Sequence, residues 1–542
     1  MPSNSTSTSQ DSIQTLAQSL AQSLAQSFLE LSSQFRLGEL PTERRHPLTK
    51  NLSTLAQTDL EAALRLLRDV ELGAFDSAFA ESDSELRALS GEIAETWAGG
   101  GRVFFCGCGA TGRLSVSLEA LWRKECLARG WPTSENVISF IAGGDYALVR
   151  SIENFEDHPE YGAQQLRDLG FSSGDLLVAT TEGGETPFVI GATLEAASIS
   201  SRSPWFLFCN PSESLIGLER CCEVFSNANV RSLSLPTGPM ALAGSTRLQA
   251  STVLMLAGGA CLFSAQDAGD PCSRIQDFRI AFAAVDFAIL APLISREAEA
   301  YAKGKHCLHS ADEHAITVMT DTTERSPTFS IAPFENELSS TDRLAWTYLT
   351  VPSVTRPDHA WAKILMRPPR ALKWKSVAGK YDDSVMGGFD FSTQTVLRRR
   401  LRVGAPLIFS VESGAGFLHL SIGGRSASLP VSGSRLTEHL ILKCAMNMSS
   451  TLVMGRLGRF ESNLMLYVKA SNNKLIDRAI RYISLLLSDR GVTSYSYDEI
   501  CRALFEVRAT LDPEDSIVLR TLDKLTAVAG QTRHTDPAGR LA

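Results

Sequence analysis

The sequence predicts an α/β protein built on doubly wound parallel sheets. Strand-like and helix-like segments alternate from residue 102 to residue 263, which is the pattern of repeated βαβ units. The segment Arg102–Leu114, RVFFCGCGATGRL, runs from an apolar strand through a glycine-rich turn into a helix. Both halves of the chain also end on a long apolar helix, Ser245–Phe263 and Leu436–Leu457, which favours a duplicated domain.

The composition excludes several classes of protein. A length of 542 residues suits about three domains. The net charge of -8 argues against a nucleic-acid partner. The eleven cysteines are scattered in apolar runs and are interpreted as reduced thiols of a cytoplasmic protein, with the nucleus as an alternative location. The apolar stretches Leu248–Phe263 and Ile280–Ile294 are short and broken, so we expect buried helices and no membrane span.

The N-terminal region is Ser/Gln-rich and repeats the unit LAQS, so residues 1–41 are expected to be disordered or partly helical. Leu52–Ala98 then predicts two helices that end at three glycines. In the next part of the chain the predicted strands are Val103–Cys106, Val137–Ile141, Leu176–Ala179, Trp205–Cys209 and Val230–Leu235. The predicted helices are Arg113–Arg129, Ser151–Leu169, Pro187–Ala197, Ser214–Cys222 and Ser245–Phe263.

The second half is less regular. Phe278–Ala302 predicts one long helix. Strands are expected at Ala315–Thr320, Leu407–Val411 and Phe417–Ile422, with an irregular region over Pro352–Lys380 between them. The last segments predict only helices, Lys474–Leu487, Tyr497–Val507 and Pro513–Ala529, which form a small all-α cap. The expected units are therefore 1–41, 42–268, 269–471 and 472–542.

Three loops that follow predicted strands carry glycines and hydroxyl groups. They are Gly107–Arg113, Thr180–Pro187 and Gly244–Arg247. At the carboxyl edge of a parallel sheet such loops can converge on one anion. The spacing Gly107-x-Gly109-x-x-Gly112 also matches the dinucleotide fingerprint, but the acidic residue that follows, Asp145, lies too far along the chain. Dinucleotide binding, or a tight turn without a ligand, stays an alternative.

The order of motifs GCGATGR, IAGGD, SIENFED, TTEGGETPF and GSTR resembles the sugar isomerase (SIS) domain. More narrowly it resembles the bacterial N-acetylmuramic acid 6-phosphate etherases and the animal glucokinase regulatory protein, because ERRHP at 43–47 and NLM…ASNNKL at 463–475 match that family. About two hundred residues separate the third loop from the second of these signatures, as in the two-domain regulatory protein. The resemblance implies two SIS-like, flavodoxin-like αβα domains, whose fusion favours a monomer.

The resemblance also implies the residues that bind a sugar phosphate. They are Gly109, Ala110 and Thr111 in the first loop, Thr181, Glu182 and Gly183 in the second, Ser245 and Thr246 in the third, and Lys443 in the last long helix. Ala110 replaces a hydroxyl residue and Gln249 a lysine of the family. Glu182 stands where Ser or Ala is usual, and its carboxylate would repel a phosphate unless it turns outward or bonds sugar hydroxyls. Lys443 has an alternative interpretation as a lysine that extends from an apolar helix.

The etherase reaction needs a base for the C2 proton and an acid for the leaving ether oxygen, which suits two carboxylates. Glu153 matches one family glutamate, with a surface charge as the alternative. The other slot holds Leu121. Glu119 falls on the opposite face of the helix, and Glu125 lies one turn further on.

We therefore expect a binding protein of the glucokinase regulatory protein type, without etherase catalysis. It would bind a phosphorylated hexose or amino sugar of the fructose 6-phosphate type, and the resemblance implies a sugar kinase as partner. The alternative is an etherase-type lyase or a sugar-phosphate isomerase. No cofactor is expected.

Two further groups of residues need an interpretation. His306, His309 and His314 lie in KHCLHSADEH, where a solvated connection is favoured over a metal site. A basic run contains Lys363, Arg367, Arg370, Lys373 and Lys375. It is either a partner surface or, by default, a solvated loop.

Overall fold

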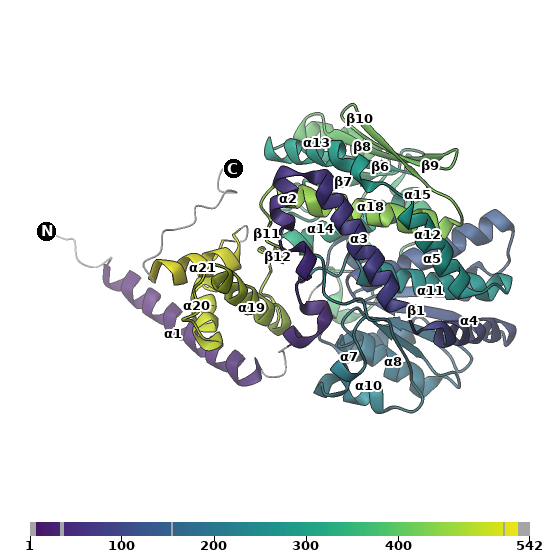
Figure 1. The fold of residues 1–542 in the computed structure, drawn as a ribbon, viewed down its shortest axis with the longest axis horizontal. Helices are drawn as coiled ribbons and strands as arrows, with labels where there is room; N and C mark the ends of the chain where they lie inside the picture. Colours follow the sequence, from purple (N-terminus) through teal and green to yellow (C-terminus); the bar gives the residue numbers. More distant parts are fainter. Residues whose placement is uncertain (1–6, 33–36, 153–154, 513–514, 529–542) are drawn as a thin grey trace.

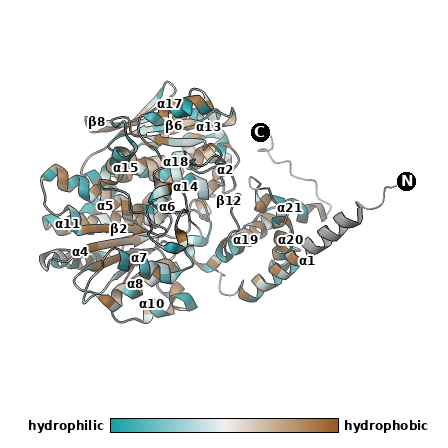
Figure 2. Cartoon of the chain, turned by 180° about the vertical axis from the view of Figure 1, so that it is seen from behind, coloured by the Kyte–Doolittle hydropathy of each residue, from teal (hydrophilic) through white to brown (hydrophobic). Residues whose placement is uncertain are grey.

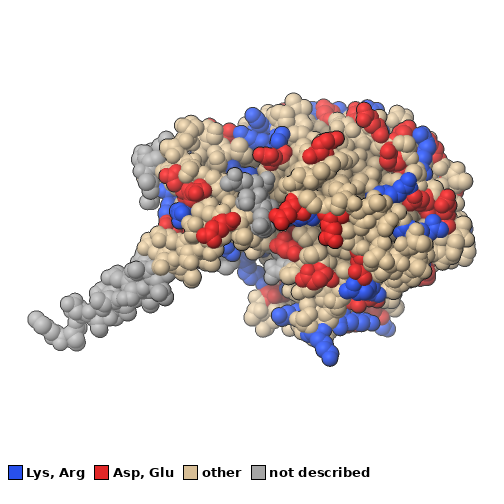
Figure 3. Space-filling model, turned by 90° about the horizontal axis from the view of Figure 1, so that it is seen from below, with Lys and Arg blue, Asp and Glu red and all other residues tan. Residues whose placement is uncertain are grey.

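The computed structural model describes residues 7–32, 37–152, 155–512 and 515–528. Two five-stranded sheets with their helices form the main body, and helices from both ends of the chain stand beside it (Figure 1). On the face seen in Figure 3, acidic and basic side chains are interspersed. Among the described residues, no single helix is long and apolar enough to cross a membrane; Pro271–Ala283 and Phe287–Ala302 reach that hydropathy only together and are bent by 59°.

The first sheet is parallel throughout, with the strand order β2-β1-β3-β4-β5. This is the flavodoxin-like order, so the predicted fold class is confirmed. Its strands are β1 (Val103–Gly107), β2 (Val137–Ile141), β3 (Leu176–Thr180), β4 (Trp205–Phe208) and β5 (Arg231–Ser234). Strand β2 and its neighbours are brown in Figure 2, as expected for strands covered on both faces.

Alternate side chains of β1 enter two separate cores. Phe104 and Cys106 pack with Phe188 of helix α8 (Pro187–Ile199), whereas Phe105 packs with Leu118 of helix α5 (Ala110–Arg129). Because neighbouring strand residues point to opposite faces, each face needs its own layer of helices. The remaining helices of this half are α2 (Leu52–Thr58), α3 (Leu60–Ala78), α4 (Asp83–Ala98), α6 (Tyr146–Val149), α7 (Pro159–Asp168), α9 (Glu213–Ile216), α10 (Cys222–Ser226) and α11 (Ala250–Asp267).

Two helix starts differ from the prediction. The segment Ser151–Leu169 is not one helix, since α7 begins only at Pro159, a residue suited to the first helical turn. The predicted helix Ser245–Phe263 begins at Ala250, because Gln249 has a φ of 34° that no helix continues. The third loop is therefore longer than the sequence pattern indicated.

The second sheet has the order β10-β9-β8-β6-β7. Its strands are β6 (Cys307–Ala311), β7 (Thr347–Thr350), β8 (Leu407–Gly414), β9 (Phe417–Ile422) and β10 (Arg425–Pro430). Strands β6, β7 and β8 are parallel, whereas β8, β9 and β10 form an antiparallel meander. This sheet is therefore mixed, in contrast to the parallel sheet that the sequence predicts.

The predicted strand Ala315–Thr320 is wrong, since these residues open helix α14 (Ala315–Phe329). The helix is buried on nearly all sides, so its apolar run shows no helical period and looks like a buried strand. The predicted long helix over 278–302 is two helices, α12 (Pro271–Ala283) and α13 (Ala291–Ala302), because Asp286 caps a short 3-10 turn between them. The other helices are α15 (Pro357–Leu365), α16 (Asp383–Met386), α17 (Gln394–Val403) and α18 (Arg435–Arg456).

The cap consists of α19 (Asn473–Asp489), α20 (Tyr497–Arg508) and α21 (Ile517–Val528), joined to the body through a short hairpin of β11 (Phe460–Glu461) and β12 (Leu464–Met465). The N-terminal helix α1 (Ser7–Leu31) lies along α20 (Figure 1). Its buried stripe is formed by Ala21, Ala25 and Phe28, whereas Leu20 and Leu24 of the LAQS repeats are exposed.

Candidate functional site

The carboxyl ends of β1 and β3 lie side by side, at the point where the strand order of the first sheet changes direction. Ligands of doubly wound sheets bind at such a point. A cavity of about 200 Å³ lies there, lined by all three predicted loops, by helix α14 and by the start of the cap. The cavity holds roughly 13 to 20 water-sized groups, which is the size of a phosphorylated hexose.

The first loop brings Gly109 and Ala110 to the cavity wall at the N-terminus of α5. Gly109 has a φ of 55°, and a Cβ on Gly107 would lie 2.4 Å from the backbone of Thr111, so both glycines are required by the turn. Thr111 does not line the cavity. Its Oγ1 accepts from the N–H of Cys108 at 3.0 Å and closes the turn instead. The prediction that Thr111 faces the ligand therefore needs correction.

The second loop brings Glu182 and Gly183 to the cavity, together with Glu185 and Thr186. Thr181 is again a correction, because its buried hydroxyl bonds Thr186 Oγ1 at 2.9 Å and holds the loop in shape. Glu182 does not turn outward: its Oε1 accepts from Thr246 Oγ1 of the third loop at 3.1 Å. The second and third loops are thus joined by a carboxyl group that lies on the cavity wall.

The third loop places Ser245 and Thr246 at the cavity. Gly244 precedes them with a φ of 84°, and a Cβ there would lie 2.4 Å from Tyr482 Oη of the cap. Gln249, in place of the family lysine, points away from the cavity. Its Oε1 accepts from the N–H of Ala241 at 2.7 Å and its Nε2 donates to the carbonyl of Pro239 at 2.9 Å, so it holds the loop together.

The cap contributes two of the cations that line the cavity. Lys474 Nζ lies 2.6 Å from Glu185 Oε1 and 3.1 Å from Glu156 Oε1. Arg478 Nη2 lies 2.7 Å from Glu43 Oε1. Burial raises the pKa of Glu43, but Arg478 and Arg481 outweigh it and bring the pKa to about 2. The cap is therefore held on the first sheet by ion pairs at the rim of the cavity.

These four residues, Glu43, Glu156, Lys474 and Arg478, are among the site residues that the sequence reasoning missed. A signal was present, because Glu43 lies in the ERRHP motif, Glu156 in SIENFED and the two cations in and after ASNNKL. Those motifs served only to recognise the family. Their charged side chains could have been assigned to the site.

Glu182 has a carboxyl group whose pKa is shifted in the opposite direction from that of Glu43 in the same cavity. Burial raises its pKa to about 7, although the hydrogen bond from Thr246 acts in the opposite direction. At neutral pH the group is therefore divided between its acid and its carboxylate forms. A carboxyl group poised in this way can both give and take a proton.

The raised pKa of Glu182 predicts a pH-dependent stability. The folded protein binds this proton more tightly than the unfolded chain, so stability is lost as the pH rises from about 4.5 through 7. Glu182→Gln removes the charge and is expected to raise Tm above that of the wild type at pH 8. Thermal unfolding at pH 4 and pH 8 checks this, since the difference between the two proteins should vanish at pH 4. An equal difference in Tm between Glu182→Gln and the wild type at both pH values would contradict a raised pKa of Glu182.

Helix α14 of the second half closes the cavity from the opposite side. Glu324, Pro327 and Thr328 line it, and Glu324 Oε2 lies 2.9 Å from Nη1 of Arg113 in α5. Both halves of the chain therefore contribute to one site. The first half supplies the loops, and the second half supplies a wall.

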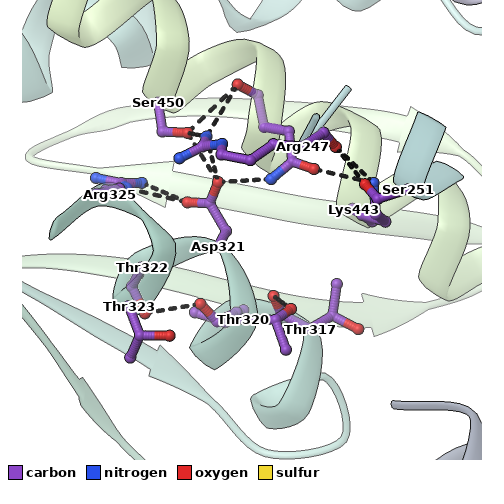
Figure 4. Close-up of polar contacts among 12 residues, drawn as sticks. Arg247, Ser251, Thr317, Thr320, Asp321, Thr322, Thr323, Arg325, Lys443 and Ser450 are labelled. Atoms are coloured by element: carbon purple, nitrogen blue, oxygen red, sulfur yellow. Dashed lines mark hydrogen bonds and ion pairs between the residues drawn. The ribbon is translucent and has the colours of Figure 1, made fainter. Parts of the chain in front are cut away.

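Lys443 does not line this cavity. Its Nζ donates to the carbonyl of Arg247 at 2.8 Å, to Thr252 Oγ1 at 2.9 Å and to Asn447 Oδ1 at 3.1 Å (Figure 4). It lies behind the third loop and supports Arg247, whose Nη2 lies 3.1 Å from Asp321 Oδ1 of α14. The prediction that Lys443 reaches the sugar phosphate is not what the structure shows, and burial lowers its pKa.

The position that corresponds to the second glutamate of the family holds no carboxyl group. Leu121 is fully buried in the core. Glu119 faces the other way and binds Arg367 and Arg370, which outweigh the effect of burial and lower its pKa to about 2. Glu125 pairs with Arg129 and Arg435 outside the cavity. The one residue predicted to be catalytic if the protein is an enzyme, Glu153, lies outside the described residues.

The histidine-rich segment and the basic run are both more ordered than predicted. His309 belongs to strand β6 and is fully buried, and burial lowers its pKa to about 4. Among the described residues, no three His, Cys, Asp or Glu side chains are placed to hold a metal ion. In the basic run, Arg367 is buried between Glu119 and Asp145, so the default of a solvated loop is wrong at that residue.

The chain is similar to known proteins of one family. A family model described as the glucokinase regulatory protein N-terminal SIS domain matches residues 87–197. The N-acetylmuramic acid 6-phosphate etherase of Synechocystis is 36% identical over 220 residues, which are 41% of this chain and 66% of that protein. The etherase of Photorhabdus laumondii is 30% identical over 223 residues, 41% of this chain and 68% of that protein. The chain thus spans about two thirds of the length of these relatives.

Among solved structures, tagatose-6-phosphate ketose/aldose isomerase from Escherichia coli aligns over 76% of this chain and 97% of its own, with 11% identity and a TM-score of 0.41. The parallel sheet with three loops at its switch point defines a SIS-domain protein. More narrowly, the chain belongs to the family of the N-acetylmuramic acid 6-phosphate etherases.

The main functional expectation, a binding protein that regulates a sugar kinase and lacks etherase catalysis, is wrong. Curated relatives at 30–36% identity are named as etherases, which supports the alternative. The error arose from the weight given to Leu121. One missing carboxylate does not remove acid–base chemistry from a cavity that holds another carboxyl group, Glu182.

Proposed function

We propose that the protein is a carbon–oxygen lyase that acts on an amino-sugar 6-phosphate and removes lactate from N-acetylmuramic acid 6-phosphate. The names of its relatives and the size of the cavity support this proposal. The observation that carries it is the carboxyl group of Glu182, with a pKa of about 7, on the wall of a cavity formed by three loops.

The loops suit a phosphate group. The N-terminus of α5 presents unpaired N–H groups around Gly109 and Ala110, and Ser245 and Thr246 add hydroxyl groups from the third loop. Arg113 and Lys474 supply positive charge at the cavity. Because Arg113 and Lys474 also pair with carboxylates of the protein, the phosphate would compete with Glu324 and Glu185 for them.

The reaction requires one proton to leave C2 and one to reach the ether oxygen on C3. The C2 proton is acidic when C1 is an open-chain carbonyl. As the C2–H bond breaks, a C2=C3 double bond forms, the C3–O bond breaks, and lactate leaves with a proton; water then adds back across the double bond. We assign a proton transfer to Glu182, which stands in the cavity while the usual second carboxylate slot holds Leu121.

Incubation of the full-length protein with N-acetylmuramic acid 6-phosphate tests the proposal. We expect lactate and N-acetylglucosamine 6-phosphate as products, measured by coupled oxidation of lactate and by mass spectrometry. Fructose and glucose 6-phosphates belong in the same screen, because an aldose–ketose isomerase also begins by removing a C2 proton. Interconversion of these sugars without lactate release would sink the lyase proposal in favour of an isomerase. A monomeric state, expected from two fused domains, stays a prediction.

A further inference from the structure

A second, smaller cavity lies beside the candidate site, between helices α5, α11, α14 and α18. Its volume is about 30 Å³. Arg113, Arg247 and Lys443 line it together with Ser117, Ser251, Thr317 and one acidic residue, Glu324. A cavity of this size holds roughly two water-sized groups, so it is too small for a sugar phosphate and large enough for a monatomic anion.

The two arginines bring unused hydrogen-bond donors to this cavity. Arg113 and Arg247 are each only 3% exposed. Nε and Nη1 of Arg247 have no hydrogen-bond partner among the described residues, and neither do Nη1 and Nη2 of Arg113. Nη1 of Arg113 lies 2.9 Å from Glu324 Oε2, but without the angle of a hydrogen bond. Buried charged donors without partners are costly, and an ordered ion or water is the usual explanation.

The charges around the cavity do not balance. Glu324 pairs with Arg113, and Glu297 pairs with Arg325. Asp321 is shared by Arg325 and Arg247 (Figure 4). Lys443 donates only to neutral oxygens. The nearest further carboxyl group is Glu71, whose pKa burial raises to about 7, so at neutral pH it offsets only part of this charge. One positive charge therefore lacks a full counter-charge in a buried region.

We propose that the cavity between Arg113, Arg247 and Lys443 binds one small inorganic anion of the size of chloride. The unpartnered guanidinium N–H groups of Arg113 and Arg247 are the donors such an anion needs, and the charge of Lys443 adds attraction although its three N–H groups already bond protein oxygens. The anion would also link the two halves of the chain, since the arginines belong to the first half and Lys443 to the second. It would steady the third loop of the candidate site, because Arg247 follows Thr246 directly.

Bromide identifies the occupant directly. Crystals of the wild-type protein soaked in sodium bromide should show an anomalous peak at the bromine edge within hydrogen-bonding distance of Arg247 Nη1 and Arg113 Nη2. Data from a crystal in sodium gluconate serve as the control, because gluconate is too large for the cavity. Density without an anomalous peak at this position means that water fills the cavity, and it would overturn the proposal.

Thermal unfolding gives a second measurement in solution. At constant ionic strength, gluconate is replaced stepwise with chloride. Once the chloride concentration exceeds the Kd for chloride, each tenfold increase in that concentration should raise Tm of the wild type by roughly 1 °C. Lys443→Met should lose this dependence. Lys124→Met is the matched control, since Lys124 is also buried between the two halves but donates to the carbonyl of Glu313, outside this cavity. A halide dependence that persists in Lys443→Met, or is lost equally in both variants, contradicts the proposed site.

Discussion

Glu182→Gln is expected to slow lactate release from N-acetylmuramic acid 6-phosphate by about 10²–10⁴-fold, because glutamine cannot transfer a proton. The loss should fall on kcat. KM should not rise, since the amide keeps an oxygen that can accept from Thr246 Oγ1 and carries no charge to repel the phosphate. Steady-state kinetics with both proteins measure the two constants separately.

The pH profile strengthens this test. In the wild type, kcat/KM should change around pH 7, where the Glu182 carboxyl group of the free enzyme titrates. This pH-dependent change in kcat/KM should be absent in Glu182→Gln. Glu125→Gln is the matched control, because Glu125 lies on α5 but pairs with Arg129 and Arg435 outside the cavity. Wild-type kinetics in Glu182→Gln would remove Glu182 from the reaction and leave the lyase proposal intact, whereas absence of lactate release in the wild type would remove the proposal itself.

Arg367→Met is expected to lower the free energy of unfolding by about 3–5 kcal/mol. Arg367 Nη1 donates to Asp145 Oδ2 at 2.5 Å and its Nε donates to Glu119 Oε2 at 3.1 Å, and both carboxylates are almost fully buried. Without Arg367 the buried carboxylate of Asp145 loses the guanidinium that pairs with it. Glu119, in contrast, keeps Arg123 and Arg370. A buried charge that has lost its partner is strongly destabilising. The effect should appear in urea unfolding followed by circular dichroism.

Arg402→Met is the control for this change, because Arg402 is exposed at the end of α17 and its substitution should stay within about 0.5 kcal/mol. Lowering the pH should reduce the difference in the free energy of unfolding between Arg367→Met and the wild type. The arginines hold the pKa of Glu119 at about 2 in the folded protein, so the stabilisation is complete above pH 4.5 and is lost as the pH falls towards 2. Equal urea midpoints for both variants would refute a structural role of this ion-pair cluster.

Glu182 and the ion-pair cluster of Arg367 with Glu119 and Asp145 illustrate two uses of buried charge. Glu119 and Asp145 are neutralised by arginines and hold the segment around residue 367 on the first sheet. The Glu182 carboxyl group is compensated by its own backbone N–H, by Thr246 and by the charge of Lys474, and burial outweighs these effects, so its pKa rises. A group that lowers stability at neutral pH and lies in a cavity is typical of a functional site.

Much of the first half could be predicted from the sequence. The strands β1 to β4 and their order of alternation with helices follow from short apolar runs and glycine turns, since both faces of a parallel sheet are covered. The secondary structure of the second half of the chain is harder to predict from the sequence. Helix α14 is buried on nearly all sides, so its sequence resembles that of a buried strand. Strand β6 contains histidine and serine, so its sequence resembles that of a solvated connection.

The sequence by itself determined the switch-point site, because three glycine-containing loops that follow strands of one parallel sheet lie at the same sheet edge. It also identified the family and most loop residues that line the cavity, Gly109, Ala110, Glu182, Gly183, Ser245 and Thr246. Only the tertiary structure decided which side chains face inward. Thr111 and Thr181 satisfy their own turns, and Lys443 supports Arg247, because a short hydroxyl or a buried amine bonds whichever neighbour folding brings nearest. The pKa of Glu182 likewise depends on burial and on distant partners, which residues far apart in the sequence create together.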